Sequence, residues 1–268
     1  MDRVRRRYHV DLGAYRQRFL SRRIGVRMRA RDLADEAAYG DLLVADPREY
    51  AALLEALNIN LSYFMRDAPA YAALRDRVLS DLVAARAAAG RPRVMVWSAG
   101  CASGEEPYSV AMLLADLLGA DLPRWQIRIH ATDRSTASLA RAREGVYTPA
   151  SFQALGEPYI DRYFANDADD YVVDPAIRAM VTWHPGDILT TAPPLPAYDL
   201  ILCRNVLIYY IHAQQRAVVE QLLARLAPGG YLMLGMAEML PAALRPLLTE
   251  VDGKMRLYRA KLDGEDVP

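Results

Sequence analysis

The chain of 268 residues is poor in several features that would mark a function class. Its two cysteines, Cys101 and Cys203, are too few for a disulfide framework or a cysteine-rich zinc site, and both lie beside apolar runs typical of buried strands. No apolar run approaches the ~20 residues that span a bilayer. The charged N-terminus lacks the apolar core of a signal peptide. We therefore expect a cytoplasmic protein with reduced thiols, no metal cofactor and no membrane insertion.

Net charge is also absent, because 33 basic residues balance 33 acidic ones. A neutral chain argues against a general nucleic-acid binder, although it allows a local basic patch. The hydrophobic fraction of 53% is ample for a buried core and excludes wholesale disorder. The basic residues are unevenly placed, because arginines crowd the first ~30 residues. These arginines include Arg16, Arg22, Arg23 and Arg27.

The N-terminal part predicts helices alone. Apolar residues recur at close to helical spacing between Tyr15 and Met28, and two further helical stretches cover residues 33–44 and 47–58. Asp46 precedes the second stretch as a plausible N-cap. A longer helix over residues 68–89 ends at Gly90-Arg91-Pro92. We expect an all-helical domain with its linker over residues 1–75 and a second domain over residues 76–268.

The second domain predicts an α/β fold. Apolar runs at residues 94–97, 127–131, 200–203 and 231–235 alternate with helical patterns, which favours a mostly parallel sheet with right-handed crossovers. The runs are continuous rather than alternating, as expected for strands buried on both faces. Residues 147–184 break this rhythm with one helix around residues 152–163 and short apolar runs at 171–173 and 181–183. We interpret them as a small inserted β subdomain.

Ligands of open α/β sheets bind beyond the carboxyl ends of the strands. The loop after the first strand, residues 97–106, is rich in small residues that allow close backbone approach, and a helix N-terminus follows it. It contains neither the GxGxxG dinucleotide fingerprint nor the Lys-Ser/Thr pair of a phosphate loop. Glu105 and Glu106 would repel a phosphate; alternatively, they only complement the helix dipole.

Two aspartates extend this pattern. Asp133 ends the second strand, where a carboxylate can accept hydrogen bonds from ribose hydroxyls, and Asp187 is placed to accept from an adenine amino group. The alternatives are a helix N-cap for Asp133 and a turn residue for Asp187. Together these features indicate an adenosine ligand without phosphates, which S-adenosylmethionine fits and NAD or ATP fits poorly.

Two polar segments complete the candidate site. Arg204 and Asn205 end a buried strand, where a polar pair is costly unless it binds something. The alternative is a capping asparagine beside an arginine that reaches a nearby carboxylate. Residues 60–66 lie between the two domains, which is a usual position for a ligand-binding cleft. The alternative is a surface turn before a helix.

These motifs, in order, are NINLSYFMRD (58–67), WSAGCASGEEPYSVAMLLAD (97–116), HATD (130–133) and YDLILCRNVLIYY (198–210). They resemble the motifs of the CheR family, the chemotaxis receptor-glutamate methyltransferases, and the resemblance covers nearly the whole chain. It implies a Rossmann-like class I methyltransferase domain with an inserted β subdomain, preceded by an all-helical domain. The implied cofactor is S-adenosylmethionine, with S-adenosylhomocysteine as product. The implied acceptors are glutamates on the cytoplasmic helices of chemoreceptors.

The resemblance also assigns residues. It implies cofactor contacts at Asn60, Ser62, Arg66, Ala99, Glu105, Asp133, Asp187, Ile188, Arg204 and Asn205, and action on the substrate carboxylate by Arg66 and Tyr209. Four positions depart from the usual pattern: Ser62 replaces Thr, Met65 replaces Phe, Asp187 replaces Asn and Ala237 replaces Ser. The inserted segment is shorter than in enteric members and lacks the glycine-rich loop where a receptor-tail peptide docks, which argues against tethered docking.

The arginine-rich helix gains a role from this resemblance. Receptor methylation helices are rich in glutamate, so a basic face with Arg16, Arg22, Arg23 and Arg27 would steer docking of a monomeric enzyme. The alternative is a solvated charged face. Three rival functions rank below this one: a SAM-binding protein that only senses or scaffolds, a methyltransferase for a non-receptor substrate, and a nicotinamide dehydrogenase, for which the glycine fingerprint is missing.

Overall fold

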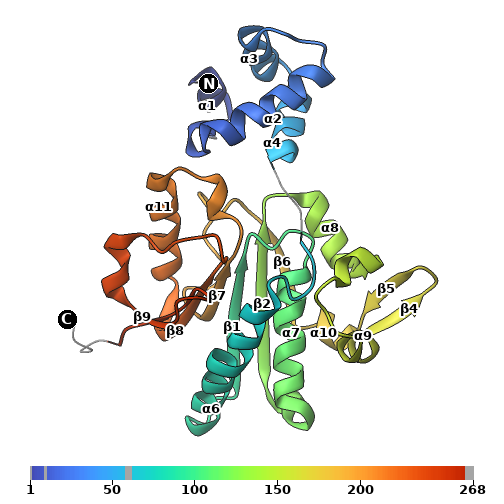
Figure 1. Ribbon diagram of the computed structural model, residues 1–268, viewed down its shortest axis with the longest axis vertical. Helices are drawn as coiled ribbons and strands as arrows, with labels where there is room; N and C mark the ends of the chain where they lie inside the picture. Colours follow the sequence, from blue (N-terminus) through green and yellow to red (C-terminus); the bar gives the residue numbers. More distant parts are fainter. Residues whose placement is uncertain (1, 9–10, 58–61, 263–268) are drawn as a thin grey trace. The chain divides into compact units, whose positions relative to one another are not determined.

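The computed structural model describes residues 2–8, 11–57 and 62–262. The chain divides into two compact units, one formed by residues 1–60 with 209–215 and the other by residues 61–208 and 216–268 (Figure 1). We call them the helical unit and the sheet unit. Within the described ranges, no helix is both long and apolar enough to cross a bilayer.

The helical unit confirms the expected helices. It contains α1 (Asp2–Tyr8), α2 (Gln17–Ala30), α3 (Glu36–Ala45) and α4 (Pro47–Leu57), with a short 3-10 turn at Leu12–Ala14. Helix α2 buries Leu20, Ile24 and Met28, four residues apart, because that spacing brings them onto one face. Asp46 accepts a hydrogen bond from the backbone N–H of Arg48 at 2.8 Å, which confirms it as the N-cap of α4.

A buried carboxylate ties the helices of this unit together. Glu49 on α4 is 1% exposed and accepts two hydrogen bonds from Arg27 of α2, at 2.9 and 2.8 Å. The Arg31 guanidinium lies 2.8 Å from the same carboxylate, and the Tyr39 hydroxyl donates to it at 2.9 Å. These donors, Arg27 above all, hold the pKa of Glu49 below its usual value although burial opposes them.

Residues 209–215 belong to the helical unit although they are distant in sequence. Tyr209 accepts a hydrogen bond at its backbone oxygen from the N–H of Arg16 at 2.9 Å, and its ring lies 4.8 Å from that of Phe19. Ile211 donates to the carbonyl of Ala14, and Tyr210 forms a β-bridge with Tyr15. The aromatic residues after the CRN sequence are therefore fixed by the segment that leads into α2.

The sheet unit is built on a seven-stranded sheet of order β6-β2-β1-β7-β8-β10-β9. Neighbours from β6 to β8 pair in parallel, and β10 is antiparallel to both β8 and β9. This confirms the α/β fold with a mostly parallel sheet. The strands are β1 (Arg93–Ala99), β2 (Gln126–Asp133), β6 (Val181–Pro185), β7 (Tyr198–Cys203), β8 (Leu226–Leu234), β9 (Leu248–Asp252) and β10 (Leu257–Ala260).

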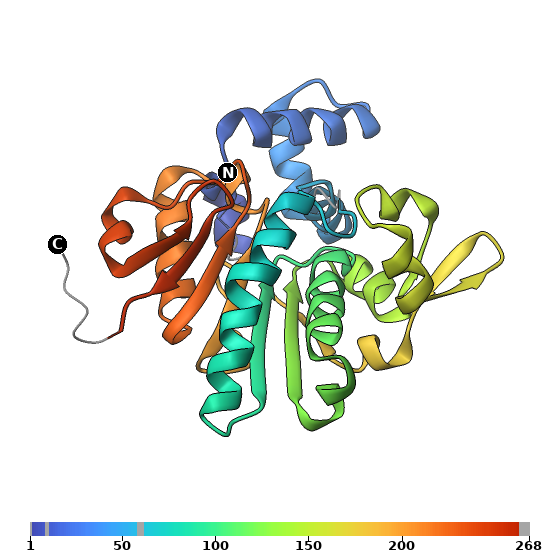
Figure 2. The same cartoon turned by 60° about the horizontal axis from the view of Figure 1, so that its bottom comes forward.

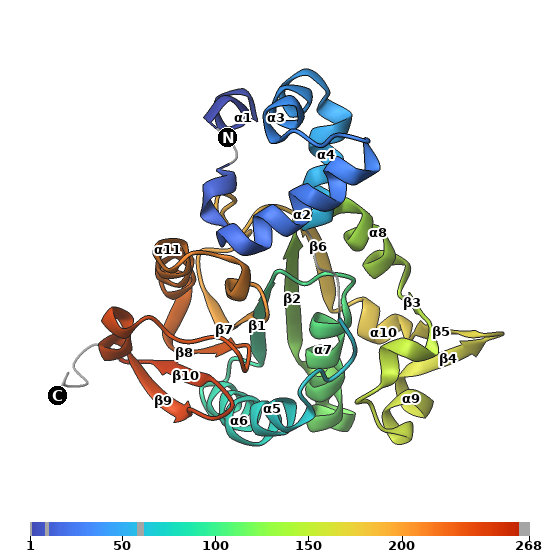
Figure 3. The same cartoon turned by 45° about the horizontal axis from the view of Figure 1, so that its top comes forward.

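Helices cover both faces of this sheet (Figure 3). One face packs against α5 (Ala68–Ala73), the π-helical turn Leu74–Leu79, α6 (Ser80–Ala88), α7 (Glu105–Leu118) and α8 (Thr136–Glu144); the other packs against α11 (His212–Leu223). Each face of the sheet has its own hydrophobic core; we call the one that contains α7 residues the first core and the one that contains α11 residues the second core. Strand β1 contributes to both, because Val94 and Val96 point into the first core and Met95 and Trp97 into the second. In Figure 2, α6 and α7 lie in front of the central strands.

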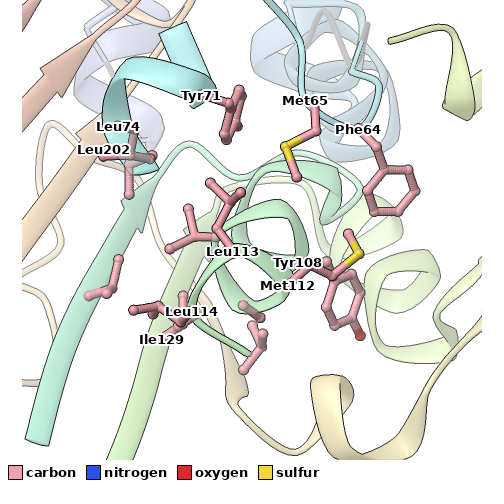
Figure 4. Packing of buried hydrophobic residues seen from close by; sticks show 14 of the residues in the cluster. Phe64, Met65, Tyr71, Leu74, Tyr108, Met112, Leu113, Leu114, Ile129 and Leu202 are labelled. Carbon is pink, nitrogen blue, oxygen red and sulfur yellow. The ribbon is translucent and has the colours of Figure 1, made fainter. Parts of the chain in front are cut away.

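The boundary between the units lies earlier than the expected residue 75. Residues 61 onward belong to the sheet unit, because Phe64, Met65, Tyr71 and Leu74 are buried in the first core. Figure 4 shows these side chains facing residues of α7 such as Leu113. The segment from 62 to 75 is thus part of the sheet unit rather than of the helical unit.

The inserted region forms a second sheet of order β3-β5-β4. Its elements are β3 (Val146–Tyr147), a 3-10 turn at Pro149–Phe152, α9 (Glu157–Tyr163), β4 (Phe164–Asp167), β5 (Asp170–Val173) and α10 (Pro175–Arg178). The assignment of residues 181–183 to this subdomain was wrong. They form β6, which pairs with β2 at the edge of the main sheet, from Ile129 opposite Val181 to Asp133 opposite Pro185.

The Glu49 cluster gives a pH-dependent prediction. Between the lowered folded pKa of Glu49 and its unfolded value near ~4.3, the unfolded chain binds more protons, so stability falls as the pH drops through this window. Glu49→Gln should weaken the helical unit by about 3 kcal/mol at neutral pH, because it leaves Arg27 without its charged partner, and should remove most of the acid-dependent loss.

Hydrogen exchange of peptides from residues 17–57, corrected for intrinsic rates at each pH, measures both effects. Glu36→Gln, an exposed position in the first turn of α3, is the matched control. Equal protection in the two variants would refute the assigned role of Glu49.

Candidate functional site

The candidate site lies at the carboxyl ends of β1, β2 and β7. The chain goes from β1 to β2 on one side and returns on the other side of β1 with β7, so the strand order reverses here. Three loops begin at this edge, after Ala99, after Asp133 and after Cys203. Crevices at such a reversal are the usual ligand sites of open α/β sheets.

The loop after β1 is held by its backbone. The N–H groups of Gly100 and Cys101 donate to the carbonyl oxygen of Thr132, at 2.8 and 3.0 Å. The indole N–H of Trp97 donates to the Thr132 hydroxyl at 2.9 Å. Gly100 has a φ of +87°, and a Cβ there would lie 2.5 Å from the Val206 side chain. Glycine is required at this position both for its conformation and for its space.

Asp133 joins the loops after β1 and β2. Its Oδ2 accepts a hydrogen bond from the N–H of Ala102 at 2.9 Å, and its Oδ1 accepts from the N–H of Ser135 at 2.8 Å. The N-cap of α8 is Ser135, whose hydroxyl accepts from the N–H of Ser138. The alternative interpretation of Asp133 as a helix cap is therefore wrong.

Two carboxylates open α7 behind this loop. Glu105 is 3% exposed and accepts from the Ser103 hydroxyl at 2.9 Å and from the Ser62 side chain. Glu106 accepts from the Ser98 hydroxyl at 2.8 Å. Burial raises the pKa of both carboxyl groups, and the serine hydroxyls oppose this shift. Both groups lie in the first turn of α7, so the alternative that they complement the helix dipole stays open beside their predicted role in the site.

Arg204 is the central cation of the site. Its side chain is 3% exposed, and its Nη2 donates to the carbonyl of Arg66 at 2.8 Å and to the carboxylate of Asp67 at 2.7 Å. Its Nη1 lies 3.9 Å from Glu106, and the guanidinium lies 5.0 Å from the centre of the Tyr71 ring. The interpretation of Arg204 as an arginine that reaches a nearby carboxylate is thus confirmed. Among the described atoms, its buried Nε has no hydrogen-bond partner.

The segment held by Arg204 is strained. Met65 and Asp67 have positive φ angles of 53° and 63°, values that non-glycine residues rarely adopt. The N–H of Met65 donates to the Ser109 hydroxyl at 3.0 Å, so the turn is fastened at both ends of Arg66. Positive φ angles on both sides of one residue are costly, and such strain is often stored at functional sites.

Glu238 is a residue that sequence reasoning missed. It is 2% exposed and accepts four backbone N–H bonds of 2.6–3.0 Å, from Gly235, Asn205, Val206 and Leu207. Its carboxylate therefore fixes the loop after β7, where Asn205 has a φ of +59°. Burial raises the pKa of Glu238, and the four N–H donors oppose this shift. An acidic residue soon after the buried strand β8 was the only sequence signal.

The remaining predicted residues are placed as follows. Ala99 is fully buried at the end of β1, and Ile188 is half-buried against the second core. The carboxylate of Asp187 accepts from the N–H of Leu189 at 2.9 Å, which confirms its alternative role as a turn residue and leaves adenine recognition a prediction. Asn60 lies outside the described residues. The structure places Tyr209 in the helical unit.

The sequence matches two family profiles. Residues 60–254 match the profile described as CheR methyltransferase, SAM binding domain, and residues 1–57 match CheR methyltransferase, all-alpha domain.

Curated relatives agree with these profiles. Chemotaxis protein methyltransferase 1 of Pseudomonas aeruginosa is 32% identical over 239 residues, 86% of this chain and 85% of the relative. The chemotaxis protein methyltransferase of Escherichia coli is 31% identical over 242 residues, 88% of this chain and 81% of the relative. An uncharacterized 104.1 kDa protein of Rhodobacter capsulatus is 34% identical over 256 residues; the match covers 95% of this chain but 26% of that protein.

The described residues suit S-adenosylmethionine. The cofactor's amino-acid end carries one positive and one negative group. The site offers the buried carboxylate of Glu105, the partly buried carboxylate of Glu106 and, among the described atoms, the unpartnered Nε of Arg204. The neutral ribose needs an acceptor such as Asp133.

The Glu238 carboxylate gives a prediction for cofactor binding. In Glu238→Gln, the amide nitrogen cannot accept a hydrogen bond, so two of the four backbone N–H groups lose their acceptor. We expect S-adenosylhomocysteine to bind about tenfold more weakly and the thermal midpoint to fall, because each unpaired buried N–H costs ~1–3 kcal/mol. Calorimetric titration and thermal unfolding measure these changes.

Glu220→Gln is the matched control, because the Glu220 side chain on α11 is 45% exposed and, among the described residues, its ion pair is with Arg216. Glu238→Gln protein with the affinity of this control would show that the carboxylate does not position the loop.

Proposed function

Because the chain belongs to the CheR methyltransferase family, we propose that it transfers a methyl group from S-adenosylmethionine to glutamate side chains of chemotaxis receptors, forming methyl esters. The chain is a SAM-dependent methyltransferase. The acceptor is the proposed part. It is carried by the two chemotaxis protein methyltransferases of 32% and 31% identity, which align over most of both chains.

A glutamate carboxylate suits this site chemically. With a reference pKa near ~4.3 it is ionised at neutral pH, so it needs no general base before it attacks an electrophilic methyl carbon. The bound cofactor supplies that carbon on a positively charged sulfur, which leaves as a neutral thioether. Catalysis then depends on aligning the carboxylate oxygen, the methyl carbon and the sulfur, and on excluding water.

We assign the substrate carboxylate to Arg66 and Tyr209. Arg66 is half-buried, and the bonds to its carbonyl and to the N–H of Met65 hold its backbone in one conformation. Its guanidinium lies 5.9 Å from the ring centre of Tyr63, and its charge helps to keep Glu106 ionised. A guanidinium fork binds a carboxylate through two parallel hydrogen bonds. The Tyr209 hydroxyl orients the same group.

The arginines expected to form the basic face differ in their contacts. Arg27 is committed to Glu49, Arg16 donates from Nε to the carbonyl of Tyr210 at 3.2 Å, and Arg23 lies over the Phe19 ring. Arg22 is exposed. The exposed arginines of this helix are Arg18, Arg22 and Arg29. We propose that these three steer the acidic receptor helix, because exposed charges act over the Debye length during encounter.

The role of Asp133 in ribose binding is tested by titration. Asp133→Asn removes the negative charge and one acceptor, so we expect at least tenfold weaker binding of S-adenosylmethionine and S-adenosylhomocysteine. Calorimetry on the full chain measures both. Asp121→Asn, at a position whose side chain is 64% exposed, is the control. Unchanged affinity would remove Asp133 from the cofactor site.

The receptor assignment is tested by transfer of a labelled methyl group to receptor cytoplasmic fragments. We expect base-labile methyl esters on glutamates of the fragments, and turnover reduced at least ~100-fold in Arg66→Ala and several-fold in Tyr209→Phe, with much smaller changes in cofactor affinity. Arg93→Ala, an exposed residue at the start of β1, is the control.

Two results would contradict the proposal. Full turnover in both variants would remove Arg66 and Tyr209 from the chemistry. Wild-type protein that binds the cofactor but esterifies no receptor fragment would overturn the acceptor.

A further inference from the structure

A second cavity lies in the sheet unit, away from the residues assigned to the cofactor. It has a volume of about 370 Å³ and is lined by Tyr108 of α7, Arg143 of α8, Pro175, Arg178 and Ala179 of the α10 segment, and Trp183 of β6. Figure 1 shows α10 beside α7 and β6. The volume falls in the range of small-molecule sites, ~300–1,000 Å³.

Two guanidinium groups share this cavity without a counter-ion. Arg143 donates from Nη2 to the carbonyl of Trp183 at 3.3 Å, and Arg178 donates from Nη2 to the carbonyl of Arg143 at 2.8 Å. These bonds hold both side chains in place but leave their charges unneutralised. In the described part of the chain, no carboxylate lines the cavity and neither arginine forms an ion pair. Burial, together with the Arg143 charge, lowers the pKa of His184.

Two aromatic rings, those of Tyr108 and Trp183, also line the cavity. The Trp183 ring is half-buried and meets the Tyr108 ring edge-on, with centres 5.3 Å apart. The Tyr108 hydroxyl donates to the carbonyl of Ala142, which fixes that ring. The indole therefore offers a fixed flat surface beside two cations. Flat nitrogen heterocycles stack on such surfaces, and arginine forks match phosphate oxygens.

The Trp183 ring also contacts the loop between β1 and α7, residues 100–104. A Cβ on Gly104, the residue before α7, would lie 2.9 Å from the ring, so the indole packs directly on this backbone. Gly104 has a φ of +99° and precedes Glu105 of the cofactor site. One ring thus separates the cavity from the loop that we assign to S-adenosylmethionine.

We propose that this cavity binds a nucleoside phosphate, with the phosphate on Arg143 and Arg178 and the base against Trp183. This ligand is distinct from the cofactor. The cavity presents two guanidinium groups without ion pairs, which can bind a phosphate, whereas Arg204 in the cofactor site is already paired with Asp67. By linkage, a ligand that moves the Trp183 ring changes cofactor affinity, and the cofactor changes the affinity of the ligand by the same factor.

Guanosine diphosphate carrying a fluorescent methylanthraniloyl group is the probe, measured by anisotropy on full-length protein saturated with S-adenosylhomocysteine. Saturation prevents the probe from entering the cofactor site. We expect saturable binding, at least tenfold weaker in Arg143→Gln and in Arg178→Gln. Arg124→Gln, whose side chain is 82% exposed, is the matched control and should bind like wild type. Unchanged affinity for S-adenosylhomocysteine shows that each variant is folded.

Competition separates the two parts of the proposed ligand. Unlabelled guanosine diphosphate should displace the probe at lower concentration than either pyrophosphate or guanosine, since each of these retains one half of the recognised groups. Pyrophosphate that competes as well as the nucleotide would overturn the assignment of the base to Trp183. If the probe shows no saturable binding at concentrations up to ~1 mM, the proposed site is overturned. Equal affinity of the arginine variants and the control for the probe would also overturn it.

Discussion

The candidate site depends on one buried cation. Arg204 ends a strand that is buried along its whole length, and its guanidinium reaches across to the turn at Arg66 and Asp67. Removing an arginine from water costs several kcal/mol unless acceptors replace its hydration. The carbonyl of Arg66, the carboxylate of Asp67 and the Tyr71 ring replace part of it. The same bonds hold the turn in which Met65 and Asp67 have positive φ angles.

The charges around this cation determine which ligands suit the site. Glu105 and Glu238 are buried and Glu106 is 12% exposed, and desolvation raises the pKa of each carboxyl group. A phosphate would meet repulsion here, whereas a ligand that brings its own positive charge relieves the cost of keeping these groups ionised. The carboxylates therefore favour a sulfonium and ammonium-bearing cofactor through the same electrostatics that would exclude a nucleotide.

The sequence predicted those features whose pattern is local. The apolar runs of β1, β2, β7 and β8, and the Asp46 cap, depend on neighbouring residues and were confirmed. The loop residues 98–106 also carry a local pattern.

Features that depend on distant partners could not be predicted in the same way. Residues 181–183 are too short a run to show that they pair with β2, fifty residues earlier in the chain. Arg27 resembles any surface arginine until Glu49 is known to lie against it. Glu238 shows no motif, because its role is defined by the N–H groups of Asn205, Val206 and Leu207.

The path of the chain between its two units limits where it can be cut for a fusion or a domain exchange. Residues 209–215 lie between β7 and the body of α11 in sequence but are bonded to residues 14–16 of the helical unit. The polypeptide therefore passes between the units at three points instead of one. A deletion of residues 1–60 would strip Tyr210, which is 4% exposed, of its partner Tyr15. The N-terminal helices are thus not a detachable module: gene fusions or domain exchanges that cut only at residue 60 would separate halves of one folding unit.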